Sequence, residues 1–146
     1  MVTLVRQALR MRPDRLVVGE VRGAEVRELL AALNTGHEGG CGTIHANAVG
    51  DVVARFEALG ALGGMTRQAV HAQLLSAVRV VIHVRRGADG RRRVDSVGVL
   101  QADADGVARV TTALGPGGEA ARPRVPVQDG AAALSQLTRI EAGRWS

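Results

Sequence analysis

The stretch Leu-Val-Val-Gly-Glu-Val-Arg-Gly, residues 16–23, decides the fold of this 146-residue chain. Its first three residues form a wholly apolar run, which is typical of a short strand buried on both faces of a parallel sheet. Gly19 and Glu20 follow at the carboxyl end of that strand, where ligands of open α/β sheets bind. A carboxylate in this position can accept a proton from water or hold a hydrated Mg²⁺, and it can equally be a solvated side chain.

Helical spacing of apolar residues predicts helices on both sides of this strand. The first spans Val2–Met11 and ends before Pro13, because the residue preceding a proline avoids helical angles. The second spans Ala24–Asn34, with Val26, Leu29, Leu30 and Leu33 facing inward and Arg22, Glu25, Arg27 and Glu28 on the polar side. Two more helices are expected at Asp51–Leu59 and from the Thr66 cap to Ala77, after a small strand around Thr43 and Ile44. This alternation indicates an α/β layered fold.

The pattern changes to a period of two after Ala77, which predicts antiparallel strands. The turns contain Asp-Gly pairs, and a short helix is expected to close the chain after a Pro- and Gly-rich loop. We expect one domain over residues 1–100 and an extension over residues 101–146. The predicted strands are Val78–Arg85, Val94–Leu100 and Val107–Leu114, the loop is Gly115–Pro126, and the closing helix is Ala131–Ile140.

The composition narrows the function classes. Hydrophobic residues make up 46% of the chain, with one Phe, one Trp and no Tyr, so the core is built from aliphatic side chains. All 19 basic residues are arginine and the net charge is +5. The arginines are scattered and stacking aromatics are nearly absent, so we expect no direct nucleic-acid binding. A single cysteine excludes an internal disulfide, and no apolar run approaches the ~20 residues that span a bilayer. A cytoplasmic location is therefore expected.

A second candidate site lies in residues 36–47, which read Gly-His-Glu-Gly-Gly-Cys-Gly-Thr-Ile-His-Ala-Asn. Glycines let a backbone approach a ligand closely, and histidines can donate to phosphate oxygens. An alternative is zinc, because His37, Cys41 and His45 are spaced as three ligands, although no fourth ligand is apparent. His71 and His83 are expected to be packed or surface histidines.

A phosphate-binding loop is absent from the chain. The loop Gly-x4-Gly-Lys-[Ser/Thr] needs a lysine to reach the phosphates, and the sequence contains no lysine.

Four segments together resemble one family, the type II/type IV secretion ATPase superfamily, in its branch for tight-adherence pilus assembly and conjugal transfer. They are Ala-Leu-Arg-Met-Arg-Pro-Asp-Arg (8–15), Val-Gly-Glu-Val-Arg-Gly (18–23), Asn-Thr-Gly-His-Glu-Gly (34–39) and Thr-Ile-His-Ala-Asn (43–47). The resemblance extends from Leu4 to about Leu100. It implies the C-terminal half of a RecA-like P-loop NTPase, with a parallel sheet and flanking helices followed by an antiparallel meander and a C-terminal helix.

The resemblance also implies roles for individual residues. Glu20 would be the catalytic carboxylate and would hold Mg²⁺ through water, His45 would sense the γ-phosphate, and Arg22 would organise the site or pair with Glu20. Contacts with ATP are implied at Gly19, Gly36, His37, Thr43 and Asn47. The segment from Gly39 to Gly42 is more glycine-rich than is usual in the family, which weakens the case for side-chain hydrogen bonds there.

Family members act as homo-hexamers that bind Mg²⁺ and ATP and drive an inner-membrane platform protein, so peripheral association with the cytoplasmic membrane is implied. The Walker A loop, the Asp box and the N-terminal domain belong upstream of Met1. We therefore expect a fragment or a mis-assigned start that is inactive alone. The alternative is a non-catalytic module that binds and regulates the full-length motor or its platform. A coding region for the lysine loop upstream of Met1 would favour the first reading, and a promoter there would favour the second.

Overall fold

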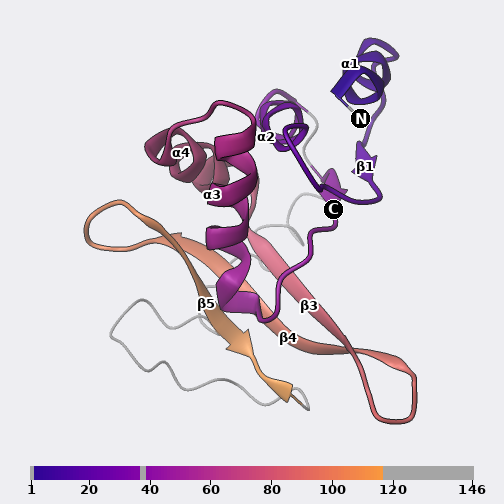
Figure 1. The fold of residues 1–146 in the computed structure, drawn as a ribbon, viewed down its shortest axis with the longest axis vertical. Helices are drawn as coiled ribbons and strands as arrows, with labels where there is room; N and C mark the ends of the chain where they lie inside the picture. Colours follow the sequence, from indigo (N-terminus) through magenta and orange to yellow (C-terminus); the bar gives the residue numbers. More distant parts are fainter. Residues whose placement is uncertain (1, 37–38, 117–146) are drawn as a thin grey trace, which may run out of the picture. The chain divides into compact units, whose positions relative to one another are not determined.

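The computed structural model describes residues 2–36 and 39–116, and these divide into two compact units (Figure 1). The first unit comprises the described parts of Met1–Asn47 and Asp51–Val78, and the second comprises those of Ala48–Gly50 and Arg79–Ser146. None of the helices in the described ranges is both long and apolar enough to cross a bilayer. The predicted loop at Gly115–Pro126, apart from its first two residues, and the predicted helix at Ala131–Ile140 lie outside the described residues.

The first unit contains all four predicted helices. They are α1 (Val2–Arg10), α2 (Val26–Leu33), α3 (Val52–Leu62, preceded by the short 3₁₀ turn η1, Val49–Asp51) and α4 (Arg67–Ala77). Their apolar faces meet in an aliphatic core in which Val26, Leu30, Leu59, Val70 and Leu74 are almost fully buried. Each such side chain stabilises the fold by about 1.5–3 kcal/mol. The predicted cap of α4 is present, since the Thr66 hydroxyl accepts a hydrogen bond from the Ala69 amide at 3.2 Å.

The predicted parallel pairing is also present in this unit. Strand β1 (Val17–Val18) runs parallel to β2 (Cys41–Gly42), with Val17 opposite Cys41. The second strand therefore begins two residues before the expected Thr43, although the Thr43 amide still donates to the Val18 carbonyl at 3.2 Å. The expectation that β1 is buried on both faces is wrong. Leu16 and Val18 are buried but Val17 is 70% exposed, because only one face of this two-stranded sheet is packed within the described residues.

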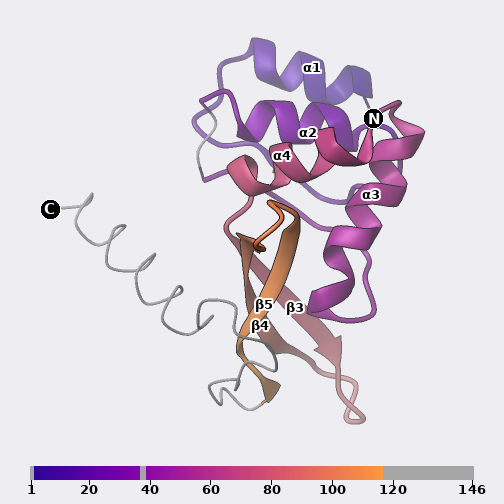
Figure 2. The ribbon, with the colours of Figure 1, turned by 90° about the vertical axis from the view of Figure 1, so that its left-hand side faces the viewer.

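The second unit is the predicted antiparallel meander (Figure 2). Strands β3 (Val80–Arg86), β4 (Arg92–Ala102) and β5 (Ala108–Leu114) form one sheet in the order β3-β4-β5. Two tight turns join them, at Gly87–Gly90 and at Asp103–Gly106. Four aliphatic side chains of β4 and β5 are buried, whereas those of β3 that share one face are exposed. The buried residues are Val99, Leu100, Ala108 and Ala113, and the exposed ones are Val80, Ile82 and Val84.

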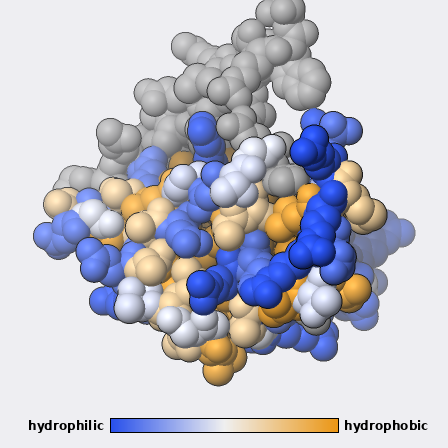
Figure 3. Space-filling model, turned by 90° about the horizontal axis from the view of Figure 1, so that it is seen from above, coloured by the Kyte–Doolittle hydropathy of each residue, from blue (hydrophilic) through white to orange (hydrophobic). Residues whose placement is uncertain are grey.

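Apolar residues also reach the surface of the first unit, where Leu4, Met11, Val17 and Leu62 are exposed. On the face that Figure 3 draws, apolar side chains appear as separate areas between hydrophilic ones.

Candidate active site at the end of strand β1

The backbone around Glu20 is fixed by hydrogen bonds to the segment that continues β2. The Thr43 hydroxyl donates to the Gly19 carbonyl, and the Val21 amide donates to the Thr43 carbonyl at 2.9 Å. Val21 is 1% exposed, so its side chain anchors the chain directly after the carboxylate. Glu20 thus lies between two fixed residues at the carboxyl end of β1, as the sequence pattern predicted.

Close packing beneath this site explains one of its glycines. A Cβ atom on Gly42 would lie 3.1 Å from Cδ2 of Leu29 in α2 and 3.6 Å from the carbonyl oxygen of Val18. The Leu29 contact is tighter than a normal Cβ contact, so a larger residue would require the Leu29 side chain to shift, whereas the distance to Val18 is an ordinary van der Waals contact. Gly42 thus allows β2 to lie close to α2.

Three side chains meet at the end of β1. Oε1 of Glu20 lies 2.5 Å from Nε of Arg22 and 2.8 Å from Nε2 of His45. The Glu20 side chain is 24% exposed, while Arg22 and His45 are 74% and 80% exposed. The carboxylate is thus partly sheltered and two cationic or hydrogen-bonding groups stand outside it, in contact with solvent. Such an arrangement leaves room for a negatively charged ligand next to Arg22 and His45.

The electrostatics keep this carboxylate ionised. The ion pair with the Arg22 guanidinium is the main reason that the pKa of Glu20 lies below its ordinary value, and the same contact raises the pKa of Arg22. Partial burial acts in the opposite direction and raises the pKa of Glu20, whereas His45 lowers it to a smaller extent than Arg22 does. Glu20 therefore carries a full negative charge at neutral pH.

One residue next to this group was misjudged from the sequence. Glu25 was expected on the polar side of the second helix, but it is buried, with 9% of its surface exposed. Its Oε1 accepts hydrogen bonds from the backbone amides of Arg22, at 2.9 Å, and Gly23, at 3.1 Å. The only signal in the sequence is an acidic residue just after an Arg-Gly turn, where free amides precede a helix.

Of the other predicted site residues, Gly19 and Thr43 lie beside Glu20, whereas Gly36 and Asn47, among the residues that the structure describes, are not joined to it. Gly36, with a φ of +93°, ends α2, and Asn47 is exposed; within residues 2–36 and 39–116, no hydrogen bond or ion pair joins either of them to Glu20. His37 lies outside the described residues, so the zinc alternative through His37, Cys41 and His45 stays a hypothesis. In the part of the chain that the structure describes, no three His, Cys, Asp or Glu side chains gather as metal ligands.

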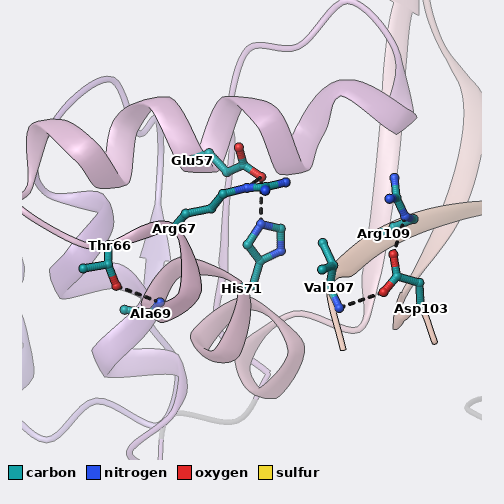
Figure 4. Close-up of polar contacts among 8 residues, drawn as sticks. All are labelled: Glu57, Thr66, Arg67, Ala69, His71, Asp103, Val107 and Arg109. Carbon is teal, nitrogen blue, oxygen red and sulfur yellow. Dashed lines mark hydrogen bonds and ion pairs between the residues drawn. The ribbon is translucent and has the colours of Figure 1, made fainter. Parts of the chain in front are cut away.

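The two remaining histidines are held by carboxylates away from this site. His71, buried in α4, contacts Oε1 of Glu57 in α3 at 2.7 Å, and the exposed Arg67 contacts the same oxygen at 3.1 Å (Figure 4). His83 lies 3.4 Å from Asp95 across the β3–β4 pair. Figure 4 also shows Asp103 holding the β4–β5 turn through the Val107 amide and Arg109. These contacts are structural, as expected for His71 and His83.

Comparison with known proteins places these features in a family. The family model described as "Type II/IV secretion system protein" matches residues 1–123. The chain is 58% identical over 139 residues to the "Putative conjugal transfer protein" of Mycobacterium tuberculosis H37Rv, which covers 95% of this chain and 37% of that protein. It is 39% identical over 92 residues to the conjugal transfer protein TrbB of Rhizobium radiobacter, covering 63% of this chain and 28% of that protein.

A solved structure shares the fold. The VirB11 ATPase from the type IV secretion system of Brucella suis, in complex with sulphate, is 28% identical and superimposes with a TM-score of 0.58, covering 67% of this chain and 32% of that one. The chain thus spans about a third of the length of the relatives that it matches.

Proposed function

The chain belongs to the type II/IV secretion system protein family, and we propose that it forms the part of a secretion motor ATPase that supplies the catalytic carboxylate. The observation that carries the proposal is the contact of Glu20 with both Arg22 and His45 at the end of β1. In this role Glu20 orients and deprotonates the water that attacks the γ-phosphate. Arg22 and His45 donate hydrogen bonds to the phosphate oxygens once the nucleotide separates them from Glu20.

The donor set of the site suits Mg²⁺ and ATP. A carboxylate that stays ionised at neutral pH is an oxygen ligand of the kind that Mg²⁺ prefers, and Glu20 would hold the ion through a water molecule. Bound Mg²⁺ would neutralise charge on the phosphates. Gly19, Gly36, His37, Thr43 and Asn47 remain proposed nucleotide contacts. The lysine that grips the β- and γ-phosphates in such ATPases must come from sequence other than these 146 residues, which contain none.

The names of the relatives support the biological role. They are conjugal transfer proteins and a type IV secretion ATPase. We infer that the complete motor is a homo-hexamer that couples ATP hydrolysis to the export of pilin or another macromolecular substrate. It works at the cytoplasmic face of the membrane, bound to an inner-membrane platform protein.

A chimeric motor tests the assignment directly. The 139 matching residues of the Mycobacterium tuberculosis relative are replaced by those of this chain, and steady-state phosphate release is measured with Mg²⁺ and ATP. We expect an active chimera in which Glu20→Gln lowers kcat by about 100-fold or more while ATP binding persists. Glu28→Gln, which removes the same charge on α2 where Glu28 pairs with Arg6, is the control and keeps the chimera's rate. An active chimera that hydrolyses ATP equally fast after the Glu20→Gln substitution would show that Glu20 has no catalytic role.

A further inference from the structure

Glu25 is a buried carboxylate that the proposed chemistry does not use. It stands at the start of α2, five residues after Glu20, and its Oε1 accepts the backbone amides of both Arg22 and Gly23. Gly23 leaves room for this approach, because a Cβ atom there would lie 3.2 Å from Oε2 of Glu25. These amides belong to the turn that carries the Arg22 side chain toward Glu20.

We infer that Glu25 is a positioning residue: by holding the backbone of Arg22 and Gly23, it aims the Arg22 guanidinium at the Glu20 carboxylate and at the phosphate that binds there. The inference rests on the proposed function, since it names a further residue of the same site. Arg22 is 74% exposed, so its side chain gains little direction from packing, and the backbone turn sets the point from which it reaches Glu20. Two charge-assisted hydrogen bonds to one ionised carboxylate restrain the backbone of that turn.

The contacts of Glu25 extend beyond those of a helix cap. A glutamate three residues into a helical turn can accept the backbone amide of the N-cap residue, and the bond from the Arg22 amide has this spacing. Glu25 also accepts the Gly23 amide, so it holds two successive amides of the turn. Its partners lie two and three residues before it, in the turn. Backbone bonds to the Arg22 and Gly23 amides keep the pKa of Glu25 low, the Arg22 bond most strongly, so the acceptor stays ionised.

Two variants of this chain separate the hydrogen bonds from the charge. Glu25→Gln and Glu25→Leu remove the same negative charge, but only Gln keeps an oxygen that can accept the two amides. The Glu20 carboxyl is titrated by NMR with selectively labelled glutamate. We expect Glu25→Leu to raise the pKa of Glu20 toward the value found in Arg22→Gln, and Glu25→Gln to leave it close to wild type. Equal pKa values of Glu20 in the Leu and Gln variants, both folded by circular dichroism, would overturn the inference.

The chimeric motor gives an independent reading. There, Glu25→Leu is expected to lower kcat roughly 10- to 100-fold, as misplacement of a transition-state contact does, with rescue by Glu25→Gln. If Glu25 acts through Arg22, the double variant Arg22→Gln/Glu25→Leu is no slower than Arg22→Gln alone. Fully multiplicative losses would show that Glu25 acts by another route. The titration does not depend on catalysis. An inactive chimera would therefore count against the proposed function, while the pKa of Glu20 in the variants would still test the positioning role of Glu25.

Discussion

At the scale of single residues, the ion pair between Glu20 and Arg22 decides the charge of the site. The guanidinium is the main cause that holds the pKa of Glu20 below its ordinary value of 4.5. A carboxyl whose pKa is lowered by folding stabilises the folded state above that ordinary value, and the contribution is lost as the pH falls through the lowered pKa. Glu20 is therefore ionised wherever the protein is near neutrality, which the proposed role as a base requires.

Replacing Arg22 should release this constraint. We predict that Arg22→Gln raises the pKa of Glu20 toward 4.5, read from the carboxyl carbon shift in an NMR pH titration. Arg27→Gln removes an equal charge from α2, and we expect it to leave the pKa of Glu20 as in the wild type. A Glu20 pKa that is the same in Arg22→Gln and in the wild type would mean that the ion pair does not form in solution.

The sequence predicted part of this site and missed the rest for a physical reason. The place of Glu20 at the end of a strand could be predicted, because a carboxylate that directly follows a short apolar run lies where the strand ends. The convergence of His45 on it depends on parallel pairing between segments 24 residues apart, which only the family resemblance suggested. Glu25 could not be assigned, because on a helical pattern it occupies a polar position, and its burial comes from the preceding turn folding back over it.

At the scale of elements, the contact of α3 with α4 depends on a residue without a side chain. A Cβ atom on Gly60 in α3 would lie 2.4 Å from Cγ2 of Val70 in α4, which is 1% exposed. In an isolated helix, alanine is favoured over glycine by about 1 kcal/mol. Overpacking of a buried contact costs about 1–3 kcal/mol, so the steric term outweighs the helix propensity.

We therefore predict that Gly60→Ala lowers the free energy of unfolding by about 1–2 kcal/mol, measured by urea denaturation followed by far-ultraviolet circular dichroism. Gly50→Ala, where a Cβ atom would meet nothing within 4 Å, is the matched control and should stay within about 0.5 kcal/mol of the wild type. The double variant Gly60→Ala/Val70→Ala should lose less than the sum of the two single losses, because the smaller side chain at position 70 removes the clash. A more stable Gly60→Ala variant would show that the two helices pack differently.

Most helices and strands could be predicted from the sequence, because in a long segment the spacing of apolar residues indicates both the type of element and its buried face. All four helices and the three antiparallel strands begin within two residues of the expected positions. The errors lie in the parallel pair, whose strands are two residues long. Periodicity cannot be read from two residues, and the apolar run at Leu16–Val18 does not say whether one or both faces are covered. The exposed Val17 answers that question for the described residues.

At the scale of the whole molecule, the family match indicates an ATPase family, whereas the composition lacks the lysine that such an ATPase uses to bind phosphate. Residues 1–123 match a secretion-system family whose solved relative is an ATPase, yet the chain contains no lysine and spans 37% of its mycobacterial relative. In P-loop ATPases a phosphate-binding loop holds the nucleoside triphosphate on which the catalytic carboxylate acts. Glu20, Arg22 and His45 are brought together in the first unit, and the phosphate-binding lysine of such a loop has no counterpart among these residues.

It follows that the isolated 146-residue chain should neither bind ATP tightly nor hydrolyse it. Phosphate release is measured with Mg²⁺ and with protein and ATP at equal concentrations, so that even one turnover per chain is detected. We expect the wild-type chain and its Glu20→Gln variant to give the same background, because a contaminating ATPase does not respond to this substitution. The chimera that supplies the lysine loop should respond to it strongly. A rate in the isolated chain that Glu20→Gln abolishes would contradict this prediction, because it would show that the chain hydrolyses ATP without the loop. Arg22 and His45, which contact Glu20, would then have to hold the phosphates.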